Sequence, residues 1–278
     1  MTVLVVGATS QVGHFLLALL ADKGIRPLAL TRHDSLPSSV APVRWLRGDL
    51  GKVMPVVPPI RWIFSAGPLD ALAAWLPDAP MLPGARVLAT SSMSAVSKLE
   101  SPVASERALA MRLKNAEVAL RNACVDRGAG WTIIRPTIIY GAGRDRSFTP
   151  LAFRARRSRL FPLPAGTGLR QPVHAGDVAN ALLAAARRPV SVDAILELGG
   201  GERLPSAEVF ARVRASLPFA TVGIPVPHLI LRALAMHPAL RGPIARLGAD
   251  LVADNTAAIE ALGVRPRTFA PDAKCWGM

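Results

Sequence analysis

The sequence predicts an α/β protein built on a doubly wound parallel sheet, with a small C-terminal substrate lobe. A glycine-rich turn joins an apolar run to an amphipathic segment at the start of the chain, and strand-like and helix-like segments alternate after it. The 278 residues are 51% hydrophobic, which suffices for one large α/β domain. We therefore expect a single domain over residues 1–278, with roughly residues 141–170 and 200–278 forming the smaller lobe.

The opening segment predicts a phosphate-binding turn of the Rossmann type. The apolar run Val3–Val6 is followed by Gly7, which lets the chain turn sharply, and by the helix-like segment Gln11–Lys23. Gly13 would let that helix pack closely against the sheet, and Ser10 stands where the motif usually has its middle glycine. Unpaired N–H groups at the helix start carry partial positive charge and attract a dinucleotide pyrophosphate. The alternative is an ordinary strand-to-helix turn.

Periodicity predicts the remaining elements and their order. The strand-like runs are Val3–Val6, Pro27–Thr31, Val43–Leu46, Ile60–Ser65, Arg86–Thr90, Thr132–Arg135 and Ile195–Leu198. The helix-like stretches are Gln11–Lys23, Leu69–Leu76, Ser105–Arg127, Asp177–Arg187 and Ser206–Ser216. We expect Asp177 and Ser206 to cap their helices, and the proline-rich stretch Met54–Pro59 to form a link without a helix.

The charge balance favours anionic ligands. The chain has 33 basic and 19 acidic residues and a net charge of +14. The densest basic cluster is Arg154, Arg156, Arg157 and Arg159, and Arg144 and Arg146 come just before it. This cluster is interpreted as a solvated surface, as a clamp for a substrate pyrophosphate, or as a site for non-specific nucleic-acid binding. We expect no specific nucleic-acid partner, because no aromatic stacking platform, zinc motif or DNA-reading fold is recognisable.

The same composition predicts a cytoplasmic protein. No run of 18 apolar residues predicts a membrane span, and no basic segment typical of a signal peptide precedes the first apolar run. Cys124 and Cys275 are isolated, so we expect neither a disulfide framework nor a metal site.

Eight motifs occur in an order typical of one enzyme superfamily. They are Gly7–Gly13, Gly48–Leu50, Ser65–Gly67, Thr90–Ser92, Ile134–Gly141, Gln171–Ala179, Leu198–Glu202 and Leu262–Arg267. The set resembles the extended and atypical short-chain dehydrogenases/reductases, which include the NAD-dependent epimerases and dehydratases of nucleoside-diphosphate sugars.

This resemblance implies a nicotinamide dinucleotide as the cofactor. The binding residues that it implies are Gly7, Thr9, Ser10, Gln11, Val12, Gly13, Thr31, Arg32, Asp49, Leu50, Ser65, Ala66, Gly67, Thr90, Lys114, Pro136, Thr137 and Ile138. Arg32 follows the second strand, where an acidic residue would bind the adenosine ribose of NAD. An arginine there can pair with a 2′-phosphate, so we expect NADP, with NAD as the alternative.

The catalytic pattern that the resemblance implies is incomplete. Members of the superfamily carry a proton-transferring tyrosine four residues before a lysine, and a serine or threonine that orients the substrate. Lys114 and Ser92 match the lysine and the serine, but Ala110 occupies the tyrosine position. An alanine cannot transfer a proton. Tyr140 is the only tyrosine and belongs to another motif. The remaining candidates for the acid are His174 and Glu106.

Two functional hypotheses remain open at this point. The first is an NADP-dependent oxidoreductase, or an epimerase/dehydratase-like enzyme, that acts on an anionic or nucleotide-linked small molecule. The second is a non-catalytic NADP(H)-binding sensor or accessory protein. The resemblance is compatible with a monomer or a homodimer. The short segment Leu69–Leu76 would reduce the helical interface through which such proteins dimerise.

Overall fold

The computed structural model describes residues 1–33, 42–189 and 192–278, and it confirms the predicted doubly wound sheet. Seven strands form the sheet in the order β11-β6-β5-β4-β1-β2-β3, and every neighbouring pair is parallel. The order reverses at β1, as in Rossmann folds, so the carboxyl ends of β1 and its neighbours meet at one edge.

The observed bounds lie close to those predicted for the sheet. The strands are β1 (Val3–Val6), β2 (Leu28–Thr31), β3 (Arg44–Arg47), β4 (Ile60–Ser65), β5 (Met81–Thr90), β6 (Gly130–Pro136) and β11 (Ala194–Leu198). The covering helices are α1 (Gln11–Asp22), α2 (Leu69–Trp75), α4 (Ala104–Asp126), α6 (Ala175–Arg187) and α10 (Thr256–Leu262). Residues 48–59 join β3 to β4 without a helix, as the prolines predict.

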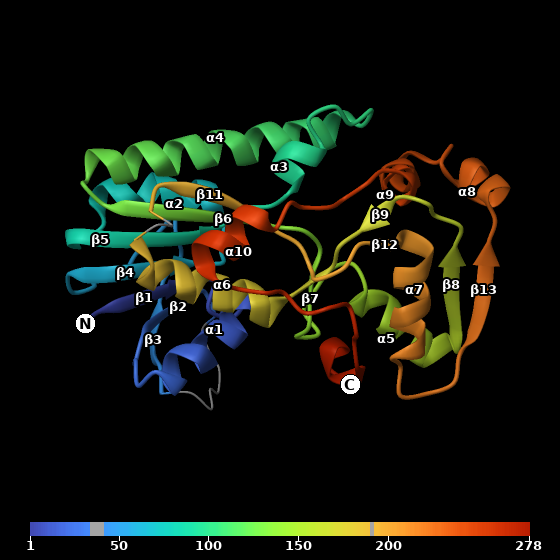
Figure 1. Cartoon of the computed structure of the whole chain (residues 1–278), viewed down its shortest axis with the longest axis horizontal. Coiled ribbons are helices and arrows are strands. Elements are labelled where there is room, and N and C mark those ends of the chain that lie inside the picture. Colours follow the sequence, from blue (N-terminus) through green and yellow to red (C-terminus); the bar gives the residue numbers. More distant parts are fainter. Residues whose placement is uncertain (34–41, 190–191) are drawn as a thin grey trace.

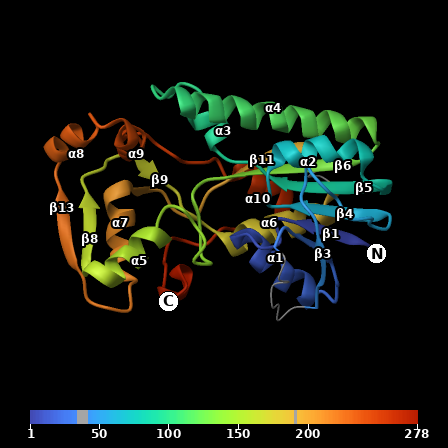
Figure 2. The same ribbon diagram turned by 180° about the vertical axis from the view of Figure 1, so that it is seen from behind.

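Helices cover both faces of the sheet, and the alternation of side chains along β1 shows why. Val3 and Val5 belong to a core with Leu16 of α1 and Leu182 of α6. Leu4 and Val6 point the other way, into a core formed with α2 and α4. Figures 1 and 2 show α2 and α4 on one side of the sheet and α1 and α6 on the other. Burial on both faces explains why the strands are almost continuously apolar.

A second group of elements lies beyond the carboxyl edge of the sheet (Figure 1). It contains α5 (Thr149–Ser158), β8 (Leu160–Pro164), α7 (Ser206–Ala215), β13 (Val222–Val226), α8 (His228–Leu234) and α9 (Pro238–Gly248). Its own core includes Phe148, Phe161 and Trp276. Of these elements, the sequence patterns predicted only α7. We refer to this group as the lobe; its division from the sheet remains a prediction.

Short strand pairs connect the lobe to the sheet. They are β7 (Ile139–Tyr140) with β10 (Val173–His174), and β9 (Leu169–Arg170) with β12 (Leu204–Pro205). The guanidinium of Arg170 is buried and donates to the carbonyls of Leu169 and Ala249, which ties β9 to the end of α9. The small strands each contain two residues, too few for a periodic pattern to reveal them.

Two predicted helix caps are wrong. The cap of α6 is His174, whose Nδ1 accepts the Gly176 N–H at 3.0 Å, and Asp177 lies within the first turn, bonded to Arg267. Ser206 is the first residue of α7 rather than its cap, and its hydroxyl donates to the carbonyl of Leu247 at 3.0 Å. In both cases the side-chain oxygen that could have capped the helix instead bonds a residue distant in sequence, Arg267 or Leu247.

Candidate active site

The β1–α1 turn is shaped by two glycines that no larger residue could replace without movement. Gly7 has a φ of +68°, and a Cβ there would lie 2.5 Å from the backbone of Ala66. A Cβ on Gly13 would lie 2.4 Å from the carbonyl oxygen of Gly7. Gly13 therefore permits close approach to the turn itself, rather than to the sheet as the sequence had suggested.

Ser10 caps the helix that follows the turn. Its backbone is extended, and its Oγ accepts the N–H of Gly13 at 3.0 Å, so it caps α1. The N–H groups of Gln11 and Val12 lie in the same first turn, where no intrahelical acceptor exists. The side chain of Gln11 donates to the carbonyl of Ile139 at 3.2 Å. Its buried Oε1 accepts no hydrogen bond from the described residues, which leaves an acceptor free beside the turn.

Arg144 adds a positive charge to this turn, and sequence reasoning did not assign it there. Its Nη1 donates to the carbonyl oxygen of Thr9 at 2.6 Å, across 135 residues. Burial, and then the charge of Arg144, lower the pKa of His14 on α1. The turn therefore combines helix amides with a guanidinium, both of which favour an anion.

The ends of β2 and β3 bring three of the predicted residues together. Thr31 is buried, its carbonyl accepts the N–H of Gly48 at 2.9 Å, and its Oγ1 accepts the N–H of His33 at 3.2 Å. Asp49 follows Gly48, and Leu50 is buried next to it. Arg32 is exposed just after β2 and is followed by His33 and then by residues 34–41, which lie outside the described part of the chain.

The ends of β4 and β5 complete the edge. Ser65 is fully buried, its carbonyl accepts a hydrogen bond from Thr90 Oγ1 at 3.4 Å, and Ala66 N–H donates to Val6 at 3.0 Å. A Cβ on Gly67 would lie 3.1 Å from Val6. Hydrogen bonds also hold the segment Pro136–Ile138. The carbonyls of Pro136 and Ile138 accept the N–H groups of Met93 and Val173. Thr137 donates its N–H to the carbonyl of Leu198 and its hydroxyl to the carbonyl of Gln171.

The two predicted catalytic residues lie on elements that follow β5. Ser92 Oγ accepts the N–H of Ser94 at 3.1 Å, at the start of the short helix α3 (Ser94–Ser97). Lys114 is half-buried in the middle of α4. Ala110 lies one turn earlier on the same helix face, and its side chain is fully buried. The position of the expected tyrosine is therefore closed to solvent.

Glu117 is a residue that the sequence analysis missed. Its buried carboxylate accepts hydrogen bonds from Arg135 Nε at 2.8 Å and Arg135 Nη2 at 2.5 Å, and from Ser91 Oγ at 2.5 Å. The hydrogen bond from Arg135 to Glu117 raises the pKa of that guanidinium. This bidentate pair fixes α4 to the ends of β5 and β6, and so sets the position of Lys114. The sequence signal for Glu117 was its position three residues after Lys114, which places both residues on one face of α4.

Tyr140 and His174 are packed together. Their ring centroids are 5.2 Å apart, and Phe269 contacts the opposite side of Tyr140 at 4.9 Å. Burial raises the pKa of the Tyr140 phenol well above its usual range, which opposes a role in proton transfer near neutral pH. Burial, and then the charge of Arg267, lower the pKa of His174, whose Nδ1 is already used in the helix cap.

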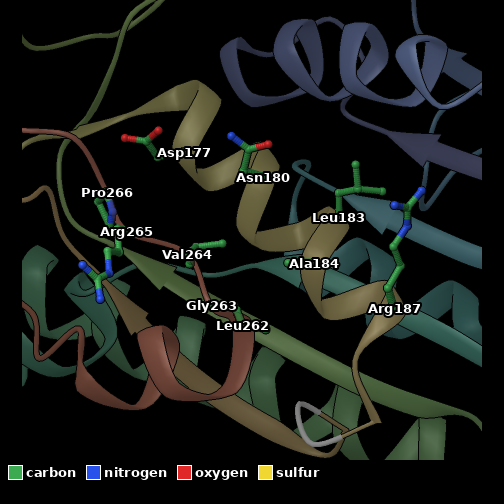
Figure 3. Close-up of a pocket in the computed structure, with 10 residues that line it drawn as sticks. All are labelled: Asp177, Asn180, Leu183, Ala184, Arg187, Leu262, Gly263, Val264, Arg265 and Pro266. Carbon is green, nitrogen blue, oxygen red and sulfur yellow. The ribbon is translucent and has the colours of Figure 1, made fainter.

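A separate hollow of about 400 Å³ lies between α6 and the segment that follows α10. Its lining includes Asp177, Asn180, Arg187 and Arg265. The side chains of Arg187 and Arg265 point away from each other (Figure 3). None of the predicted cofactor or catalytic residues lines it, so the candidate site remains the carboxyl edge of the sheet.

Solved structures share this architecture over nearly the whole chain. MoeE5 in complex with UDP-glucuronic acid and NAD has a TM-score of 0.73 and 23% identity, over 96% of this chain and 94% of that one. The UDP-glucuronic acid 4-epimerase of Bacillus cereus, in complex with NAD, has a TM-score of 0.72 and 12% identity, over 99% and 97%. This chain has the fold of the extended short-chain dehydrogenases/reductases. The resemblance found in the sequence is thus confirmed at the level of the fold.

One curated protein is similar to this chain in sequence. The ceramide reductase of Caulobacter vibrioides is 31% identical over 207 residues, which are 68% of this chain and 62% of that protein. This chain therefore spans less than two thirds of that relative's length. No family model matches the chain. Within the described residues, no helix has both the length and the apolar character needed to cross a membrane.

Proposed function

We propose that the protein binds a nicotinamide dinucleotide at the carboxyl edge of its sheet and acts as an NAD(P)-dependent oxidoreductase. The observation that carries this proposal is the β1–α1 turn. Two glycines bring its backbone close together, the amides of Gln11 and Val12 face no acceptor of their own, and Arg144 supplies a cation. These groups fit a diphosphate. The two solved structures described above contain NAD, which agrees with this assignment.

Arg32 supports NADP as the preferred dinucleotide. It is exposed at the end of β2, where a 2′-phosphate would lie if the ribose binds next to that strand. NAD remains the alternative, and the complexes named above contain NAD. We expect NADPH to bind at least about tenfold more tightly than NADH, and Arg32→Gln to remove the difference. Calorimetric titration of both reduced dinucleotides measures this, and equal affinities in the unmodified protein would exclude the role of Arg32.

In this proposal the residues of the chain position the dinucleotide and the substrate, and no side chain takes the place of the usual proton-donating tyrosine. The bound dinucleotide would supply or accept hydride. Lys114 would hold its ribose, and Ser92 would orient a substrate oxygen. Because Ala110 replaces the tyrosine, the proton would pass through water held by Lys114 and Ser92. The substrate is an anionic or nucleotide-linked small molecule in this proposal, as the excess of arginines suggests. A carbonyl compound also deserves testing, because the curated relative is named a reductase.

Turnover distinguishes this proposal from a non-catalytic one. The assay follows the absorbance of reduced nicotinamide with a panel of aldehydes, ketones, quinones and nucleotide sugars. We expect Lys114→Met to lower kcat/KM by about 10². The matched control is Lys23→Met, at the exposed end of α1. An unchanged rate in Lys114→Met would show that the active site is wrongly placed.

The second candidate is a non-catalytic NADP(H) sensor or accessory protein. The fully buried Ala110 in place of a proton donor favours it. It predicts tight dinucleotide binding with no turnover across the whole panel. Absence of any heat with oxidised or reduced dinucleotides would exclude both candidates.

A further inference from the structure

The outer side of the lobe exposes several large apolar side chains on neighbouring elements. We call this set the rim; it consists of Leu160, Val222, Ile224, Leu229, Ile230, Leu234 and Met236. Leu229 and Met236 are 78% and 85% exposed. Figure 1 shows β13 and α8 at the far end of the molecule from the sheet, with β13 leading into α8. The rim therefore faces away from the candidate active site.

The two-stranded sheet of the lobe has one covered and one open face. A Cβ on Gly223 would meet Leu163 and Arg214, so this position of β13 faces the interior of the lobe. Val222 and Ile224 alternate with Gly223 and face outward, and Val222 pairs with the exposed Leu160 of β8. The open face of this sheet is therefore aliphatic rather than polar.

Helix α8 continues this apolar surface. Leu231 is buried, whereas Leu229, Ile230 and Leu234 are exposed, so most of the aliphatic side chains of the helix face solvent. An almost wholly apolar groove of about 460 Å³ adjoins it, lined in part by Pro225 and Pro227 before α8 and by Ala207 and Ala211 of α7. Contiguous exposed apolar surface of this kind marks an interaction site.

The two sequence segments that contain the rim carry arginines and no acidic residue, although Arg170 is buried and Arg212 and Arg246 are paired with carboxylates. Between Asp145 and Asp177 the sequence has six arginines and no acidic residue, and between Glu208 and Asp250 it has five arginines and no acidic residue. Arg232 is exposed on α8 itself, and Arg159, next to Leu160, lies 4.8 Å from the ring of Phe219. Aliphatic side chains bordered by arginines are typical of surfaces that rest at a membrane interface.

We propose that the rim docks on the surface of an anionic lipid bilayer. Its aliphatic side chains and methionine would enter the headgroup boundary while the arginines contact lipid phosphates and anionic headgroups. A second copy of this chain is a poorer occupant, because two rims would bring arginines against arginines. Nucleic acid is also poorer, because bases stack on aromatic side chains and the rim contains none. This inference does not depend on the proposed function.

Vesicle co-sedimentation of the full chain tests this proposal. Phosphatidylcholine vesicles are compared with vesicles that also contain phosphatidylglycerol, at low and physiological salt. We expect binding to the anionic vesicles and weaker binding to the neutral ones. Leu229→Ser/Met236→Ser should lower partitioning by at least about tenfold, because it removes the two most exposed apolar side chains of the rim. Arg232→Gln should lower it less and reduce its dependence on salt.

The matched control is Met111→Ser/Val125→Ser, which removes two exposed apolar side chains of α4, 51% and 64% exposed. It should bind like the unmodified protein, and thermal unfolding should show all variants folded. Equal binding of the rim variant, or no vesicle binding by the unmodified protein, would overturn the proposal. So would a rim variant that changes only the oligomeric state, or vesicle binding that duplex DNA abolishes.

Discussion

The buried carboxylate of Glu117 and the half-buried guanidinium of Arg135 stabilise each other next to the candidate active site. Taking either from water is costly, and the bidentate geometry together with the Ser91 hydroxyl offsets that cost. We expect Glu117→Leu to destabilise the fold by about 3 kcal/mol, because it leaves the half-buried guanidinium of Arg135 without this carboxylate. Chemical denaturation measures this change.

The double variant Glu117→Leu/Arg135→Met supplies the control. It removes both charges together, so it should recover most of the stability lost in the single variant. Arg135→Met completes the cycle. If the losses of Glu117→Leu and Arg135→Met simply add in the double variant, the two side chains are not coupled and the pair does not position α4.

His174 makes the stability of the fold depend on pH. Its pKa is lowered by burial, and then by Arg267, although Asp177 and Asp272 partly oppose this effect. The unfolded chain therefore gains a proton before the folded chain does, and stability falls as pH drops below the ordinary histidine pKa. The contribution is fully present above that pKa.

The variant His174→Asn isolates this effect, because asparagine can also cap a helix but does not titrate in this range. We expect its melting temperature to fall less than that of the unmodified protein between about pH 7 and pH 5. Part of the decline should remain, because the pKa of His14 is also lowered. Identical pH profiles for the two proteins would contradict the assignment.

At the scale of elements, the turn between β1 and α1 depends on close backbone contact. A methyl group on Gly13 would collide with the carbonyls of Gly7 and Ala8, so Gly13→Ala must move the turn or the helix. We expect dinucleotide affinity to fall by at least about tenfold while the sheet still forms. Gly248→Ala is the matched control, because no atom lies within 4 Å of a Cβ there. Calorimetry would contradict this prediction if both variants bound alike.

At the scale of the whole molecule, one ion cluster connects the lobe to the sheet. The Glu106 carboxylate on α4 contacts Lys98 at 3.3 Å and Arg246 of α9 at 3.0 Å. Burial raises the pKa of Glu106, but the Ser101 hydrogen bond and the two cations outweigh it, so the pKa lies below its usual range. The cluster lies at the start of the helix that carries Lys114, so it couples the lobe to the candidate site.

Breaking this cluster should loosen α9 without unfolding the sheet. We expect Glu106→Gln to raise amide hydrogen exchange in α9 several-fold, because it removes the partner of Arg246, while the bonds to Leu247 and Ala249 at the end of the helix remain. Glu260→Gln, at an exposed position of α10, is the control. An exchange rate in α9 that is the same in both variants would show that other contacts hold the lobe.

The sheet could be predicted closely because its signals are local. The apolar runs at β1 and β4 match the structure residue for residue, and α1 differs by one residue at its end. The lobe could not be predicted in this way. Helices such as α5 and α8 are short and carry arginines or exposed leucines, so their few apolar residues do not form the long stripe that identifies a helix packed on a sheet.

The sequence by itself determined the doubly wound sheet, the glycine turn before α1 and the order of motifs along its edge, because each depends on residues within one or two elements. Only the tertiary structure decided that His174 caps α6, that Glu117 pairs with Arg135, that Arg144 reaches Thr9, and that the outer side of the lobe is apolar and basic. These features arise where the folded chain brings distant residues together or leaves side chains uncovered, and no local periodicity records such contacts.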